Sequence, residues 1–114
     1  MDLATQSNGD VRVISVNGSL DALTAPELAD ALATELRASH AKLVIDLTGL
    51  QYTSSAGLRV LLNNVKDARN RGGDLRLAAV QSNVKKVLDL SGFMSILKSF
   101  DDVNTAVQSF ADPR

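Results

Sequence analysis

Residues 42–62 read KLVIDLTGLQYTSSAGLRVLL, and this stretch decides the fold. Its first part, residues 42–47, is a continuous apolar run instead of an alternating one, the pattern of a strand covered on both faces. A polar loop over residues 48–52 follows. From residue 56 to about residue 70, apolar side chains return at helical spacing and form one stripe. The stretch therefore predicts a central strand, a loop and an amphipathic helix.

Two extended segments open the chain, residues 3–7 and 11–16, and they are joined across Asn8-Gly9. This dipeptide readily supplies the positive φ angles of a tight turn, so a β-hairpin is predicted. Asn17-Gly18 is expected to break the second strand.

The sequence Thr24-Ala25-Pro26-Glu27 is typical of a helix start. Thr24 would be the N-cap, Pro26 would lie in the first turn, and Glu27 would close a capping box. A helix over about residues 26–38 is therefore predicted. The remaining elements, read in the same way, are a strand at 75–80, a short helix at 83–90, a short strand at 96–99 and a final helix from about Asp101.

The predicted order is β-β-α-β-α-β-α-β-α, which implies an α/β fold. It forms a single mixed, mostly parallel β-sheet with about four helices giving it cover. The 114 residues fit one domain, residues 1–114, with residues 111–114 as a frayed tail.

The composition argues against several classes of function. With a formal net charge of -1, the chain lacks the excess positive charge that is typical of proteins that bind nucleic acid or an anionic membrane. No cysteine is present, so thiolate chemistry and cysteine-based metal sites are excluded. Neither a secretory signal nor a membrane-spanning run is visible, and we expect a cytoplasmic protein without a cofactor or a metal. A hydrolase triad would have to rest on His40 alone and lacks the Gly-x-Ser-x-Gly pattern, so we expect no catalytic residue and no enzyme activity.

Three hydroxyl residues, Thr53, Ser54 and Ser55, precede the second helix. Unpaired backbone N–H groups and the helix dipole favour an anion at this place, so a phosphate on one of these serines would find a suitable local field. The alternative is that Ser54 merely caps the helix.

The stretch from Asp46 to Leu62 resembles the STAS domain, specifically the small bacterial anti-sigma factor antagonists. Two further segments share the resemblance, Gly18-Ser19-Leu20-Asp21-Ala22 and Thr24-Ala25-Pro26-Glu27-Leu28, so it covers nearly the whole chain. The Gly-x-Leu-Asp element and the Ser-Ser-Ala-Gly-Leu-Arg-Val-Leu-Leu element are much more specific in combination than either is alone.

This resemblance implies a phosphorylation switch. In the family, an anti-sigma factor with a GHKL-type serine kinase fold phosphorylates the antagonist, and the unphosphorylated antagonist captures that kinase. Aligned on Gly57-Leu58, the acceptor serine of the family falls on Ser55, and Ser54 is the second choice. The expected partner-binding residues are Asp21, Thr53, Ser54, Ser55, Ala56, Gly57, Leu58 and Arg59.

Asp21 has two interpretations. The resemblance implies that its carboxylate contributes to the kinase contact or to phosphorylation. Alternatively, Asp21 is a turn residue that accepts backbone N–H bonds before the first helix.

The sequence leads to two alternative hypotheses about function. The first is an anti-sigma factor antagonist that is released from its kinase by phosphorylation at Ser55 and restored by a serine phosphatase. The second is a STAS accessory subunit or scaffold of a transporter or sensory assembly, in which the fold supplies packing without a phosphoswitch.

Overall fold

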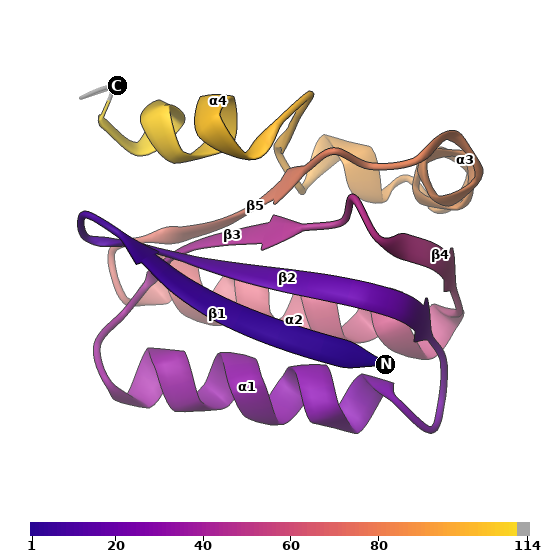
Figure 1. Cartoon of the computed structure of the whole chain (residues 1–114), viewed down its shortest axis with the longest axis horizontal. Helices are drawn as coiled ribbons and strands as arrows, with labels where there is room; N and C mark the ends of the chain where they lie inside the picture. The colour runs from indigo at the N-terminus through magenta and orange to yellow at the C-terminus, as the bar shows by residue number, and fades with distance from the viewer. Residues whose placement is uncertain (112–114) are drawn as a thin grey trace.

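The computed structural model describes residues 1–111, which form one six-stranded sheet with helices on both of its faces (Figure 1). The strand order is β1-β2-β3-β5-β6, and β4 pairs with the end of β2. The strands are β1 (Asp2–Asn8), β2 (Val11–Leu20), β3 (Lys42–Asp46), β4 (Leu50–Thr53), β5 (Asp74–Ala78) and β6 (Ser99–Phe100). The helices are α1 (Ala25–Arg37), α2 (Ser55–Asn70), α3 (Ser82–Ser91) and α4 (Val103–Gln108).

The predicted mixed, mostly parallel sheet is confirmed. β1 and β2 are antiparallel and joined through Gly9, whose φ of +65° is the left-handed conformation expected of this hairpin. Every other strand pair is parallel. α1 and α2 lie side by side under one face of the sheet, and α4 lies on the other face (Figure 1).

β3 is buried on both sides, as its apolar run predicts. Leu43 and Ile45 belong to the large core that α1 and α2 cover, whereas Val44 belongs to a smaller core under α4. Successive side chains of a strand point to opposite faces, so each face of the sheet needs its own apolar contribution from β3. No helix within residues 1–111 is long and apolar enough to cross a membrane.

The buried carboxylate of Asp74 connects α2, the sheet and, through Arg76, the C-terminal segment. It accepts hydrogen bonds from Arg69 Nε of α2 at 2.8 Å and from Arg76 Nε of β5 at 3.0 Å. The guanidinium of Arg76 also stacks on the ring of Phe110, 4.0 Å from its centroid. The charge of Asp74 is thus paired twice, as a buried carboxylate requires.

Two predictions about the strands were wrong. β2 does not end at Asn17-Gly18 but runs to Leu20, with a register shift between Gly18 and Ser19. The loop predicted at 48–52 contains β4, whose residues Leu50 and Thr53 are buried. β4 is too short to be recognised from periodicity, and it becomes a strand only because the extension of β2 supplies its partner.

Three smaller predictions also differ. The Thr24 side chain does not cap α1, because its hydroxyl donates to the Ser19 carbonyl at 2.8 Å instead. The last strand covers Ser99–Phe100 instead of 96–99, since residues 93–95 form a 3₁₀ turn. The tail was predicted from Ala111, which ends another 3₁₀ turn, and residues 112–114 lie outside the described part of the chain.

Candidate functional site

The serine segment lies where the ends of two strands meet the starts of two helices. Leu20 of β2 pairs with Thr53 of β4, and the N–H of Ser54 donates to the Leu20 carbonyl at 2.8 Å. α1 and α2 begin a few residues beyond these two strand ends. The extension of β2 to Leu20 therefore brings Asp21 beside the Ser54-Ser55 segment.

The two candidate serines differ in access. Ser55 is exposed and is the first residue of α2. Ser54 has an extended backbone, with φ −102° and ψ 175°, and its hydroxyl oxygen is buried without a hydrogen-bond partner among the described residues. The two are neighbours in the chain, but only the Ser55 hydroxyl faces solvent.

The start of α2 is uncapped. Ser54 makes no side-chain hydrogen bond to the helix, so the capping alternative is wrong for this residue. The first turn also contains no acidic side chain that would occupy the positive end of the helix dipole. The backbone N–H groups there are consequently available to a phosphate or another anion.

Asp21 holds the turn between β2 and α1. Its Oδ1 accepts the N–H of Leu23 at 2.9 Å and that of Thr24 at 3.0 Å, and its own N–H donates to the Thr24 hydroxyl at 2.9 Å. These bonds match the turn interpretation. The Thr24 N–H, followed by that of Leu23, lowers the pKa of Asp21 because both stabilise the carboxylate, although partial burial opposes them.

This network gives a testable pH dependence. A carboxyl whose pKa is lower in the folded than in the unfolded chain stabilises the fold above about pH 4, the ordinary pKa of Asp, and loses that contribution as the pH falls through its folded pKa. Asp21→Asn keeps the Oδ1 acceptor but cannot titrate. We expect its urea midpoint to lie below that of the original protein at pH 7, where the charge stabilises the fold, and the two midpoints to converge as the pH falls from about 5 to 2. If the stability of both proteins falls equally steeply as the pH decreases, the charge of Asp21 does not stabilise the turn.

The expected partner-binding residues divide into two groups. Ser55 and Arg59 are exposed, and Asp21, Ser54 and Ala56 are half-buried. In contrast, Thr53, Gly57 and Leu58 are buried. The buried residues position α2 against the sheet and present little surface to a partner.

Several large apolar side chains are exposed and were not recognised from the sequence. Leu23, in the turn that Asp21 holds, is 87% exposed. Tyr52 of β4 is 54% exposed, and Leu90 of α3, which packs against β4, is 90% exposed. Single exposed apolar side chains are common, so none of these by itself defines a docking surface. The pairing of β4 with β2 places Tyr52 beside Ser19, two residues before Asp21.

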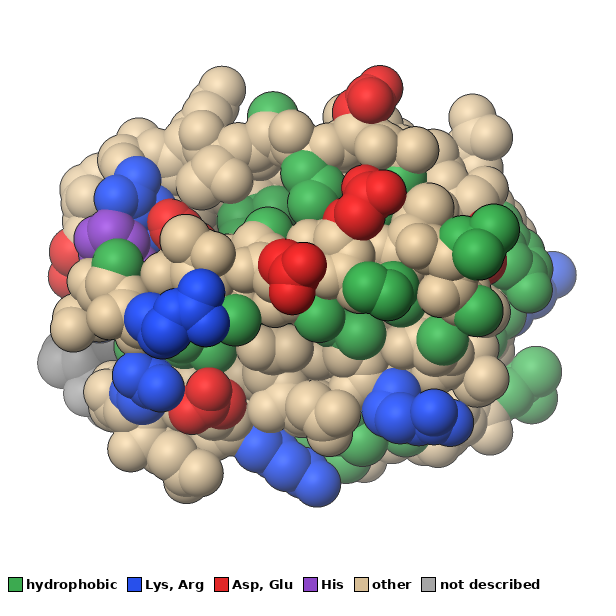
Figure 2. Space-filling model, turned by 90° about the horizontal axis from the view of Figure 1, so that it is seen from below, with side chains coloured by type: hydrophobic (Ala, Val, Ile, Leu, Met, Phe, Trp, Pro, Cys, Tyr) green, Lys and Arg blue, Asp and Glu red, His purple; other side chains and the backbone are tan. Residues whose placement is uncertain are grey.

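An apolar groove of about 410 Å³ begins beside Ser55 and runs between α1 and α2. Its lining residues include Ala25, Pro26 and Ala29 of α1 and Ala56, Arg59 and Val60 of α2. Figure 2 looks onto this side and shows hydrophobic side chains along the middle of the face, with acidic side chains mainly above and basic ones mainly below. The groove exists because its walls are built largely from small side chains.

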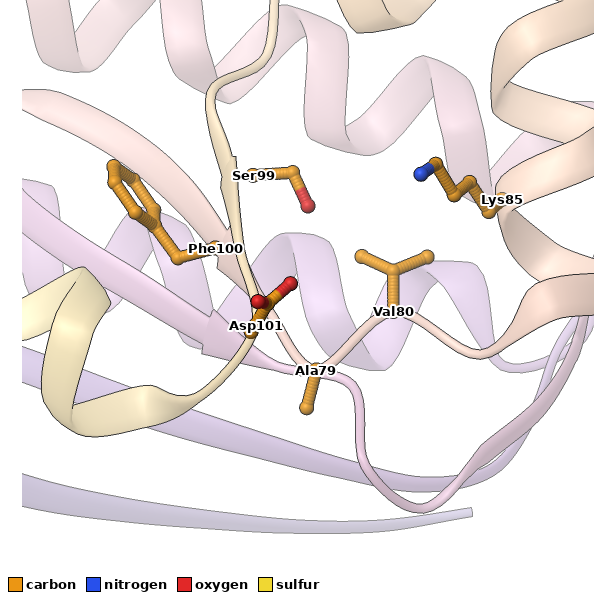
Figure 3. Close-up of a pocket in the computed structure, with 6 residues that line it drawn as sticks. All are labelled: Ala79, Val80, Lys85, Ser99, Phe100 and Asp101. Atoms are coloured by element: carbon orange, nitrogen blue, oxygen red, sulfur yellow. The ribbon is translucent and has the colours of Figure 1, made fainter.

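A smaller hollow, about 200 Å³ in volume, lies at the carboxyl ends of β5 and β6. Figure 3 shows the side chains of Lys85, Ser99 and Asp101 around it. It shares no lining residue with the groove beside Ser55. Within residues 1–111, no group of histidine and acidic side chains is arranged to hold a metal ion.

The structure is that of a small α/β domain with a serine exposed at the start of a helix. The sequence matches the STAS domain over residues 2–106, and the chain belongs to that family. It is similar to BtrV of Bordetella bronchiseptica, which is named as an anti-sigma factor antagonist, with 31% identity over 96% of this chain and 95% of BtrV.

Solved structures agree on the fold. An anti-sigma factor antagonist from Mycobacterium paratuberculosis superposes with a TM-score of 0.89 at 24% identity, covering 97% of this chain and 94% of the other. The phosphorylated form of the Bacillus cell fate determinant SpoIIAA superposes with a TM-score of 0.73 at 15% identity, covering 95% and 98%. The predicted resemblance to anti-sigma factor antagonists of the STAS family is confirmed.

Proposed function

We propose that this chain works by partner switching: it binds an anti-sigma factor that is a GHKL-type serine kinase, and phosphorylation at Ser55 releases it. The observation that carries the proposal is the exposed Ser55 hydroxyl at the uncapped start of α2. The relative BtrV, named as an anti-sigma factor antagonist, supports the choice of an anti-sigma factor as the partner.

The unphosphorylated surface is suited to protein binding. Leu23, two residues after Asp21, and Tyr52, three residues before Ser55, expose apolar area, and burying such area is the main favourable term in association. The neighbouring negative charge of Asp21 is held in the turn by backbone N–H groups. A kinase that covers this end would place its active site over the Ser55 hydroxyl.

Phosphorylation changes the charge of this surface. The Ser55 oxygen takes the γ-phosphoryl group of ATP, ADP leaves, and the hydroxyl proton is released. The product carries about two added negative charges and three acceptor oxygens. In a closely docked interface they cause repulsion and a desolvation cost, whereas the free helix terminus tolerates the anion, so release needs no refolding.

This proposal makes the chain a substrate and a binding module, not a catalyst. A serine phosphatase would return it to the binding form. Because such a kinase controls a sigma factor, we expect the exchange to take place in the cytoplasm, with residues 1–114 acting as one domain.

The experiment that tests the function is phosphopeptide mapping of the chain purified from its host. We expect phosphate on Ser55 in the tryptic peptide of residues 43–59, and none on this peptide in a Ser55→Ala variant. Ser54→Ala is the matched control and should still be phosphorylated, since the Ser54 hydroxyl is buried. An unmodified peptide under several growth conditions, together with copurification of a transporter ATPase or a large assembly, would favour the accessory or scaffold role instead.

A further inference from the structure

Arg59 lies at the edge of the groove and forms no ion pair with any residue in 1–111. It lies on the exposed side of α2, one helical turn after Ser55. No carboxylate among the described residues pairs with it, although five other basic side chains do form ion pairs with acidic residues. Arg59 is also the only charged residue among those described as lining the groove.

The groove beside Arg59 has the size and polarity for an apolar side chain. Its volume of about 410 Å³ exceeds that of one large aliphatic or aromatic side chain, and alanines and Val60 supply most of its walls. A guanidinium at the rim favours a carboxylate next to that side chain. A second copy of this chain docked symmetrically groove to groove would instead bring two Arg59 side chains together, which is unfavourable.

Ser55 and Arg59 are four residues apart on α2 and both are exposed. Side chains at this spacing are neighbours on a helix surface. A phosphate on Ser55 would therefore come within reach of the Arg59 guanidinium, and guanidinium–phosphate pairs are frequently held by two parallel charge-assisted hydrogen bonds.

We propose that the α1–α2 groove binds an apolar side chain of the kinase, that a carboxylate next to it pairs with Arg59, and that the phosphate on Ser55 displaces the kinase in part by pairing with Arg59 itself. This inference rests on the proposed function, because it assigns the partner and the regulation of the same site. It makes Arg59 a positioning residue of the switch. The phosphate then acts twice, since it repels the partner and removes the cation that the partner uses.

Binding of the kinase tests the groove. With the kinase recovered from the host, Ala29→Phe should fill the groove and lower the affinity by at least about tenfold, whereas Thr34→Phe, on the exposed side of the same helix, should not. Arg59→Gln should lower it by about tenfold and Lys66→Gln, exposed farther along α2, should leave it unchanged. Urea unfolding of each variant verifies the fold. Unchanged affinity of Ala29→Phe and Arg59→Gln would overturn the docking assignment.

The phosphate–Arg59 pair is tested without the kinase. With phosphoserine installed at position 55 during translation, a phosphorus NMR titration measures the second phosphate pKa. We expect this pKa to rise by about 0.3 pH unit in Arg59→Gln, as loss of an i,i+4 ion pair predicts, and to stay constant in Lys66→Gln. The same value in all three proteins would overturn the pairing. Failure of the unmodified chain to bind any kinase would overturn the proposed function and the docking, while this titration would still decide the pair.

Discussion

Phosphate on Ser55 is expected to lower the affinity of the chain for its kinase by about 100-fold, or about 2.7 kcal/mol. The reason is local, because a dianion is added to the exposed first residue of α2, which the kinase is proposed to cover. Like charges and unpaired acceptors brought into an interface cost several kcal/mol. Titration calorimetry with ADP present, comparing the chain with and without phosphoserine at position 55, measures the loss.

Phosphoserine at Ser39 is the matched control. Ser39 is exposed and lies just beyond the end of α1, whereas the proposed interface surrounds the start of that helix. We expect the Ser39 phosphoprotein to bind as tightly as the unmodified chain. Equal losses at both positions would mean that the phosphate acts through net charge, and the switch at Ser55 would then be abandoned.

Gly57→Ala is expected to destabilise the fold by about 2 kcal/mol, although alanine is the better helix former. A Cβ atom at this position would lie 2.6 Å from Leu20 Cγ and 2.7 Å from Thr53 Oγ1, both on buried residues. Relief requires α2 to move away from the ends of β2 and β4. Such a movement would shift Ser54 and Ser55, so kinase binding should weaken together with stability.

Substitutions at Lys66 measure the effect of helix propensity without the steric clash expected at position 57. Its side chain is exposed in the same helix, and Lys66→Gly should be less stable than Lys66→Ala by about 1 kcal/mol. At position 57 the order should be reversed, with glycine the more stable residue. Urea unfolding followed by circular dichroism measures both pairs. The same order at both positions would show that α2 does not need the close approach at Gly57.

Local patterns were sufficient to predict most of the elements. Asn8-Gly9 defines a turn by its own backbone preferences, and the stripe of α2 defines a helix by its spacing. The apolar run of β3 correctly indicated burial on both faces. These properties depend on residues that are neighbours along the chain, so one sequence is enough to recognise them.

Other elements depended on contacts between distant segments. The loop expected at 48–52 contains β4, because Gly18 and Leu20 of the extended β2 pair with it. The expected cap of α1 was lost, since the Thr24 hydroxyl found a carbonyl acceptor in Ser19. In both cases a hydrogen-bond partner far away or on another element overrode the local preference.

The sequence by itself determined the fold class, the family and the serine cluster at the start of a helix, because all three are expressed in residue types and their spacing. Only the tertiary structure decided which of the neighbours Ser54 and Ser55 is exposed, and only it assembled the groove that Arg59 lines. Access and proximity depend on which surfaces meet when α1, α2 and β4 pack at the ends of the sheet. Packing of that kind is a property of the whole fold, and no local pattern carries it.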